Sequence, residues 1–101
     1  MLYCENFINN DKEVHGVAVI SDKYHGQLHY HPVEELYNIL YGNGIMHLDG
    51  KTFDVKAGDN IWIPKNAIHN IKSTSKYIIL RYYFPKGPIE NIPYTWLSSR
   101  L

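Results

Sequence analysis

The chain has 101 residues, with ten basic and ten acidic side chains and one cysteine. Its length predicts a single domain spanning residues 1–101, and the absence of net charge or a basic cluster argues against a nucleic-acid partner. No segment reaches the ~20 apolar residues of a membrane helix, and the N-terminus lacks the apolar core of a signal peptide. The lone Cys4 excludes an internal disulfide. We therefore expect a cytoplasmic protein without a membrane partner.

Turn-forming residues recur at short, even intervals and separate β-prone segments. Asp49-Gly50, between two such segments, is typical of a two-residue hairpin turn. No segment has sustained helical periodicity, so evenly spaced strands predict an all-β antiparallel sandwich or barrel. Residues 85–101 are predicted as an irregular tail whose Tyr94, Trp96 and Leu97 can cover an open edge or the barrel mouth. The predicted strands span residues 14–20, 27–40, 45–48, 52–55, 60–63, 67–71 and 77–84.

Candidate metal ligands stand in the pattern H-x-H-x-x-x-E, formed by His29, His31 and Glu35 within the predicted strand 27–40. Side chains alternate between the faces of a strand, so positions 29, 31, 35 and 37 are expected on the same side. Two imidazoles and a carboxylate on one buried face are unfavourable without a partner, and a divalent metal is the commonest such partner. The pattern therefore predicts a metal site.

Two spaced motifs give the chain a family resemblance. H-x-H-x3-E-x6-G, about residues 29–42, resembles the first cupin motif, and G-x5-P-x4-H, within about residues 58–73, resembles the second. The resemblance extends from about residue 25 to residue 84. It implies a double-stranded β-helix, the cupin or jelly-roll barrel. It also implies one divalent transition metal held inside by His29, His31, Glu35 and His69.

Three positions depart from the cupin pattern without touching a predicted ligand. Lys23 stands where a glycine is expected, Asn66 replaces a second glycine, and Ser73 replaces the asparagine that often closes the second motif. The exchange at Asn66 is tolerable because asparagine enters the left-handed backbone region more readily than most residues. These departures concern loop geometry.

Three neutral imidazoles and one carboxylate suit Fe, Mn, Ni, Co or Zn and leave positions open for water and substrate. Such an ion can polarise an oxygen group, lower the pKa of bound water or bind dioxygen. We therefore expect a metal-dependent enzyme acting on an oxygen-rich, anionic small molecule by lyase, isomerase, decarboxylase or dioxygenase chemistry. The alternative is a non-catalytic module that binds a sugar or another small ligand.

Tyr37 is the candidate catalytic residue because it follows Glu35 at two-residue spacing and should share its inward face. A phenol beside the metal can act as an acid–base group or donate a hydrogen bond to the substrate; the alternative is that it packs as a core tyrosine. The E-x-Y extension also resembles the cupin-type lyases that cleave dimethylsulfoniopropionate. In those enzymes a metal and a nearby tyrosine assist proton abstraction, which implies lyase chemistry here.

Other residues carry weaker expectations. Arg81 either faces the barrel and pairs with a substrate carboxylate or faces outward as a solvated or interface charge. His15 and His25 are expected in exposed turns, and His47 is expected to point away from the metal. The apolar strands and the tryptophan-containing tail predict a homodimer packed through sheet faces or exchanged edge strands.

Overall fold

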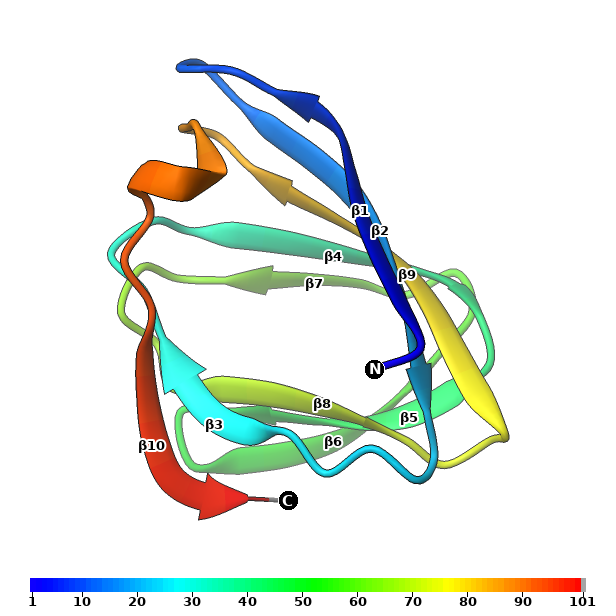
Figure 1. Cartoon of the computed structure of the whole chain (residues 1–101). Helices are drawn as coiled ribbons and strands as arrows, with labels where there is room; N and C mark the ends of the chain where they lie inside the picture. The colour runs from blue at the N-terminus through cyan, green and yellow to red at the C-terminus, as the bar shows by residue number, and fades with distance from the viewer. Residues whose placement is uncertain (101) are drawn as a thin grey trace.

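The protein forms two antiparallel β-sheets that face each other around a common interior (Figure 1). The computed structural model describes residues 1–100, with side chains for residues 1–98. The elements in chain order are β1 (Tyr3–Asn9), β2 (Val14–Ser21), β3 (Gln27–Tyr30), β4 (Glu35–Tyr41), β5 (Asn43–Leu48), β6 (Lys51–Lys56), β7 (Asn60–Ile63), β8 (His69–Ser73), β9 (Tyr77–Phe84), the 3-10 turn η1 (Ile89–Asn91) and β10 (Thr95–Arg100).

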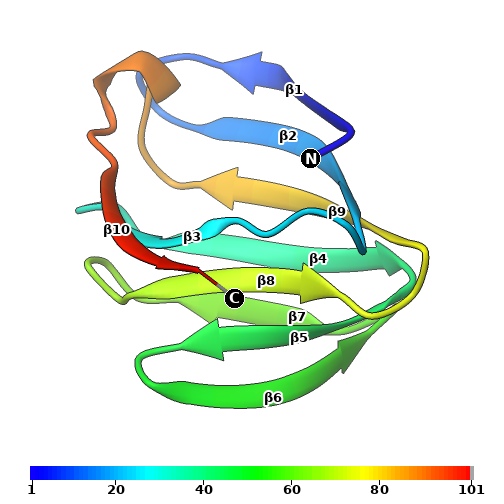
Figure 2. The ribbon, with the colours of Figure 1, turned by 60° about the horizontal axis from the view of Figure 1, so that its bottom comes forward.

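The strand order shows that the chain winds between the two sheets. One sheet has the order β1-β2-β9-β4-β7 and the other has the order β10-β3-β8-β5-β6. β9 therefore lies between β2 and β4, and β8 lies between β3 and β5, so each late strand inserts between two early ones (Figure 2). This topology confirms the predicted double-stranded β-helix.

Alternating side chains build the interior. Buried and partly exposed residues alternate strictly along β2 and the first half of β9. Val14 and Ile20 of β2, together with Ile78 and Phe84 of β9, are almost fully buried. Branched and aromatic side chains in this pattern pack well on a pleated sheet with one buried face. The two inner faces thus form the core and the walls of a hollow described below.

Turn residues adopt the backbone conformations expected from the sequence. Asp49 and Gly50 both have positive φ, 50° and 80°, as a two-residue hairpin between β5 and β6 requires. Asn66 has a φ of 63°, so it occupies the left-handed region in place of the glycine expected there.

The single strand predicted over residues 27–40 is wrong. β3 ends at Tyr30, β4 begins at Glu35, and the two strands belong to different sheets. Pro32 lies in the break; proline has no N–H to donate to a ladder and fixes its own φ, which accounts for the chain leaving β3 there. His29 and Glu35 therefore reach the interior from two strands of facing sheets.

The structure also contains two strands that the sequence did not predict. β1 pairs with β2, and every residue of β1 is exposed, so it lacks the buried-polar alternation that identifies a strand. β10 corrects the prediction of an irregular tail: Thr95 and Trp96 pair with β3 at the edge of the second sheet. Among the described residues, no helix is long and apolar enough to cross a membrane.

Candidate metal centre

Three strands and one loop bring the predicted ligands together. His29 of β3 is the direct cross-strand partner of His69 of β8, and His31 follows the end of β3. Glu35 is the first residue of β4 in the facing sheet. All four side chains are buried, and His31 and His69 are almost completely so.

Backbone carbonyls orient all three imidazole rings in the same way. The Nδ1 atoms lie at hydrogen-bond distance from the carbonyl oxygens of residues two positions away: His29 to Gln27 (3.1 Å), His31 to Val33 (2.7 Å) and His69 to Ala67 (2.8 Å). A carbonyl oxygen only accepts, so each Nδ1 carries the proton and donates it. A neutral ring of this tautomer has an unprotonated Nε2, which is the form that ligates metals.

The ligand atoms converge on one point. One nitrogen from each of the three histidines lies within 4.8 Å of the others, so the trio could hold a metal ion. Glu35 Oε1 lies 3.2 Å from His31 Nε2 and 3.4 Å from His69 Nε2. Adjacent ligand atoms bound at about 2.1 Å to one ion are separated by about 3 Å, close to these spacings. His69 Nε2 is buried without an aligned hydrogen bond, as expected of a lone pair that awaits a cation.

The pKa shifts favour the ligating forms of two of these groups. Burial, assisted by the neighbouring His69, lowers the pKa of His29 to about 4, so this imidazole is neutral at physiological pH. Burial alone would raise the pKa of Glu35, but its contacts with His31 and His69 outweigh burial and lower the pKa below its ordinary value. A neutral imidazole beside a carboxylate is the protonation state that metal binding requires.

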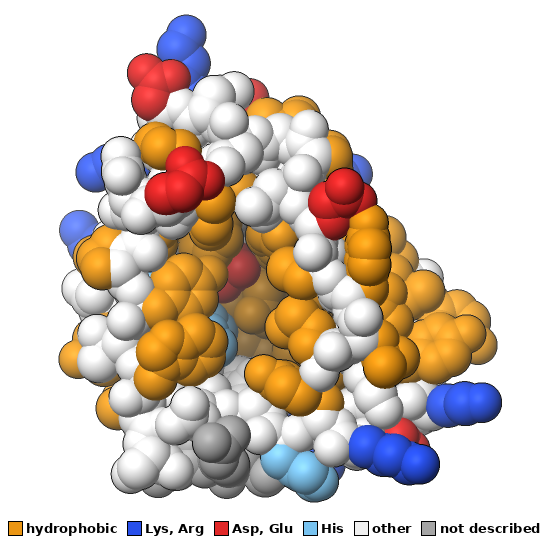
Figure 3. All heavy atoms as spheres, viewed as in Figure 1, with side chains coloured by type: hydrophobic (Ala, Val, Ile, Leu, Met, Phe, Trp, Pro, Cys, Tyr) orange, Lys and Arg blue, Asp and Glu red, His pale blue; other side chains and the backbone are white. Residues whose placement is uncertain are grey.

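A cavity of about 260 Å³ opens beside this cluster, and His29, Glu35 and Tyr37 line it. In the space-filling view, hydrophobic side chains surround a hollow with an acidic side chain at depth (Figure 3). A concave, mostly apolar site with a few polar groups at one end is the usual form of a small-molecule site.

Tyr37 faces the interior, as predicted. It is buried on β4, lines the cavity, and its ring centroid lies 6.3 Å from that of His69. Burial and the nearby charge of Glu35 raise the pKa of Tyr37 well above its ordinary value. The hydroxyl therefore keeps its proton at neutral pH.

Sequence reasoning missed several residues of the cavity wall. Tyr82 of β9 is the cross-strand partner of Tyr37 and also lines the cavity. The alternation of inward residues along β9 is the signal that could have found it. Tyr94 and Trp96 stack on each other and pack against His29, and β10 pairs with the edge strand β3, so the tail covers an open edge, one of the two expected positions. No sequence signal marks Asn70, which is buried and lines the cavity.

The remaining residues lie away from the cluster. Arg81 is exposed on the outer face of β9, and its guanidinium lies 5.7 Å from the ring centroid of Phe7, so it does not reach a substrate in the barrel. His47 on β5 is outside the metal-ligand group, as predicted. The prediction for His15 is wrong: it lies within β2, and its Nε2 is 2.7 Å from Glu13 Oε1. His25 is exposed between β2 and β3.

Fold and site together define a double-stranded β-helix with a buried histidine–carboxylate cluster beside an open cavity. The family model for the Cupin domain matches residues 16–84, so the chain belongs to the cupin family.

Three similar proteins illustrate this family relationship. An uncharacterized protein of Methanocaldococcus jannaschii, MJ1618, is 49% identical over 47 residues, 46% of this chain and 38% of that protein. The dimethylsulfoniopropionate lyase DddW of Ruegeria pomeroyi is 29% identical over 84 residues, 83% of this chain and 55% of the lyase. The chain thus spans 38% of the length of the first relative and 55% of the length of the second. A Klebsiella pneumoniae protein with a double-stranded β-helix domain has a TM-score of 0.82 at 16% identity, over 96% of this chain and 84% of its own.

Proposed function

We propose that the protein is a metal-dependent enzyme that binds one divalent transition metal (Fe, Mn, Ni, Co or Zn) through His29, His31, Glu35 and His69. It acts on a small, oxygen-containing anionic substrate bound in the adjoining cavity. Lyase chemistry is the favoured reaction class, because the chain is related to a dimethylsulfoniopropionate lyase and has a tyrosine two positions after the carboxylate ligand.

One observation carries this proposal. Each of the three histidines donates its Nδ1 proton to a backbone carbonyl, which turns the Nε2 atoms of His31 and His69 toward the buried carboxylate of Glu35. A buried carboxylate needs a positive partner, and a divalent cation at this point would serve the carboxylate and the three imidazoles together. The arrangement is therefore explained by metal binding, and its position at a cavity is typical of a catalytic rather than a closed structural site.

The residues around the cavity would have different roles in the reaction. When bound, a divalent metal supplies Lewis-acid polarisation of a substrate oxygen. Glu35 and the three imidazoles would hold the metal beside the cavity, where it can bind the anionic group of the substrate. Tyr37 holds its hydroxyl proton and would donate it to a substrate oxygen, or exchange it with the substrate as an acid–base group. Tyr94 and Trp96 cover His29 and limit water access.

Metal analysis tests the ligand set directly. We expect one divalent ion per chain in protein from metal-supplemented cells, and a sharp loss of that ion in His31→Ala and His69→Ala with the β-rich circular dichroism spectrum retained. His47→Ala is the matched control, because His47 lies outside the cluster. Full metal occupancy in the His31→Ala and His69→Ala proteins would refute the ligand assignment.

Turnover separates the enzyme from the binding-module alternative. The metal-loaded protein is incubated with dimethylsulfoniopropionate and with a panel of hydroxy and keto acids, with and without oxygen, and substrate loss is followed by NMR. Loss of a substrate that depends on His69 supports an enzyme. Saturable binding across the panel with no turnover of any member would instead establish a binding module.

A further inference from the structure

Two side-chain amides line the cavity beside the histidine cluster, Gln27 on β3 and Asn70 on β8. Gln27 precedes His29 by two residues, and Asn70 follows His69 directly. Because one residue of a strand spans about 3.3 Å, the Cα atom of each amide residue lies within about 7 Å of that of a predicted metal ligand. A small molecule bound at the metal would therefore have these amides within reach.

A backbone partner fixes the orientation of each amide. Oδ1 of Asn70 accepts a hydrogen bond from the N–H of Ile71 at 2.8 Å, which leaves Nδ2 as the free half of this amide. Nε2 of Gln27 donates a hydrogen bond to the carbonyl oxygen of Leu97 at 2.7 Å, which leaves Oε1 as the free half. Neither amide can flip without placing two donors or two acceptors against each other. The pair thus presents one donor group and one acceptor.

The free half of the Asn70 amide is buried. Asn70 is 7% exposed, and its Nδ2 atom has no hydrogen-bond partner among the described residues. A buried N–H group without an acceptor is unfavourable, and folded proteins seldom contain one. The free half of Gln27, by contrast, belongs to a partly exposed side chain. An acceptor atom that enters the cavity would satisfy the Asn70 donor.

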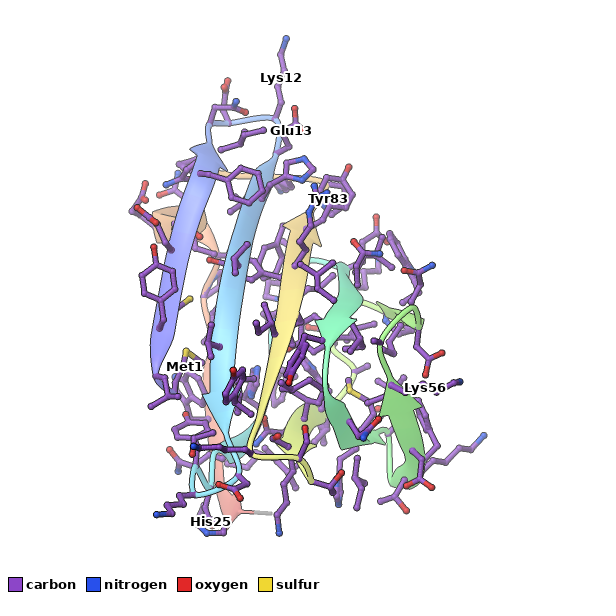
Figure 4. The ribbon with its side chains drawn as sticks, turned by 90° about the vertical axis from the view of Figure 1, so that its right-hand side faces the viewer. Met1, Lys12, Glu13, His25, Lys56 and Tyr83 are labelled. Atoms are coloured by element: carbon purple, nitrogen blue, oxygen red, sulfur yellow. The ribbon has the colours of Figure 1, made fainter. Side chains whose placement is uncertain are left out.

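The loop between β2 and β3 packs against the Asn70 amide. A Cβ placed on Gly26 would lie 2.8 Å from Nδ2 of Asn70 and 2.8 Å from the ring of Tyr24, so this close approach depends on the absence of a side chain. Figure 4 shows His25, the residue before Gly26, at the end of the molecule opposite Lys12. The amide therefore has little freedom to move, and the cavity that it lines is the space from which an acceptor can come.

We propose that Gln27 and Asn70 form a polar subsite that binds a hydroxyl group on the body of the substrate, with the Asn70 amide as donor and Gln27 Oε1 as acceptor. This inference rests on the proposed metal-dependent function and narrows its substrate class to hydroxylated organic anions. A hydroxyl is a small neutral group that both accepts and donates. A carbonyl would leave Gln27 Oε1 without a donor, and a methyl group would leave both amides unpaired.

Pairs of acids that exchange a hydroxyl for a methyl group test the subsite. The pairs are 4-hydroxybutanoate with pentanoate and 5-hydroxypentanoate with hexanoate, and binding to the cobalt-loaded full chain is followed by the visible absorption of the cobalt. We expect the hydroxy acid of at least one pair to bind about fivefold more tightly than its methyl counterpart. Equal binding within both pairs, or no binding of any of these acids, would overturn the subsite. Failure to load cobalt would instead overturn the proposed function on which the subsite rests.

Two variants assign the preference to the amides. Gln27→Met and Asn70→Leu each replace an amide with an apolar side chain of similar size, and each should reduce the preference for the hydroxy acid to less than about twofold. Asn38→Leu is the matched control, because the Asn38 amide bonds to Asn60 and does not line the cavity. It should keep the full preference.

Cobalt content and the circular dichroism spectrum check that each variant folds. Gln27 is partly exposed, so Gln27→Met decides the test even where Asn70→Leu, a change at a buried position beside His69, fails to load cobalt. A loss of preference in Gln27→Met with the affinity for pentanoate and hexanoate retained supports the subsite. A full preference for the hydroxy acid in cobalt-loaded Gln27→Met would overturn it, and so would an equal loss of preference in Asn38→Leu.

Discussion

Tyr37 shows how a single buried hydroxyl can be assigned a role from its surroundings. The ring lies in the cavity wall beside His69, and burial next to Glu35 keeps its proton in place at neutral pH. In the metal-free protein these conditions suit a hydrogen-bond donor better than a base. A bound cation would lower the pKa again, so the two roles differ in the pH profile of the loaded enzyme.

Replacing Tyr37 with phenylalanine removes the hydroxyl and keeps the ring. We expect turnover to fall on the order of 10²–10⁴-fold with metal content and unfolding midpoint almost unchanged. Tyr83→Phe is the control, since Tyr83 packs against His15 and does not line the cavity. Unaltered turnover in the Tyr37→Phe protein would show that Tyr37 has a packing role only.

The lowered pKa of His29 predicts how the stability of the metal-free protein depends on pH. Its pKa is about 4 when folded and about 6.5 when unfolded, so between these values the unfolded chain binds more protons and the free energy of unfolding rises with pH. Stability is therefore lost as the pH falls from about 6.5 to about 4, by up to about 3 kcal/mol. Glu35, whose folded pKa is lowered, adds a further loss below pH 4.5.

Urea unfolding of metal-free protein at pH 7.5, 6.5, 5.5 and 4.5 measures this loss. The His29→Gln variant lacks the titrating group and should show a flatter dependence between pH 6.5 and 4.5. If both proteins lose stability equally over that interval, His29 does not cause the loss.

At the scale of the elements, Gly16 is the position where β2 and β9 depend on each other most closely. A methyl group there would overlap the Tyr82 ring at 2.1 Å and would also lie 2.6 Å from the backbone oxygen of Glu5. Gly16→Ala should destabilise the protein by about 1–3 kcal/mol in urea unfolding. The same change in a Tyr82→Leu background, where only the overlap with the Glu5 backbone remains, should cost less. Equal costs in the two backgrounds would show that the ring is not the obstacle.

The strands also show where sequence reasoning succeeds and fails. The alternation of inward and outward residues predicted β2 and β9, because each strand places one face against the core. The predicted strand 27–40 was wrong, yet His31 and Glu35 still face the same interior. β3 and β4 belong to facing sheets, and the inward side of each strand points into the same barrel. The candidate ligands could therefore be predicted from spacing even though the element could not.

At the scale of the whole molecule, the unpredicted parts are those whose position depends on tertiary contacts. β1 is exposed throughout, and β10 is fixed by pairing with β3, so neither has a strong local pattern. These two edge strands supply Cys4, Asn6 and Trp96 to the cavity. The candidate metal ligands could therefore be predicted from the sequence, and the part of the cavity wall formed by β1 and β10 could not.

β1 is also the strand through which we expect a homodimer to form. It is the edge strand of its sheet, and it has unpaired backbone groups along its outer side. Tyr3, Phe7 and Ile8 on this strand are exposed apolar residues. Pairing of β1 with β1 of a second copy would satisfy the backbone groups and cover these side chains.

We therefore expect a homodimer through β1 and measure its mass by light scattering at micromolar concentrations. Phe7→Glu places like charges across the predicted twofold interface and should shift the mass to that of a monomer. Phe53→Glu makes the same change on β6, the edge of the other sheet, and should leave the dimer intact. A monomer mass for the unmodified chain would end the homodimer prediction, whereas dissociation by Phe53→Glu alone would move the interface from β1 to β6.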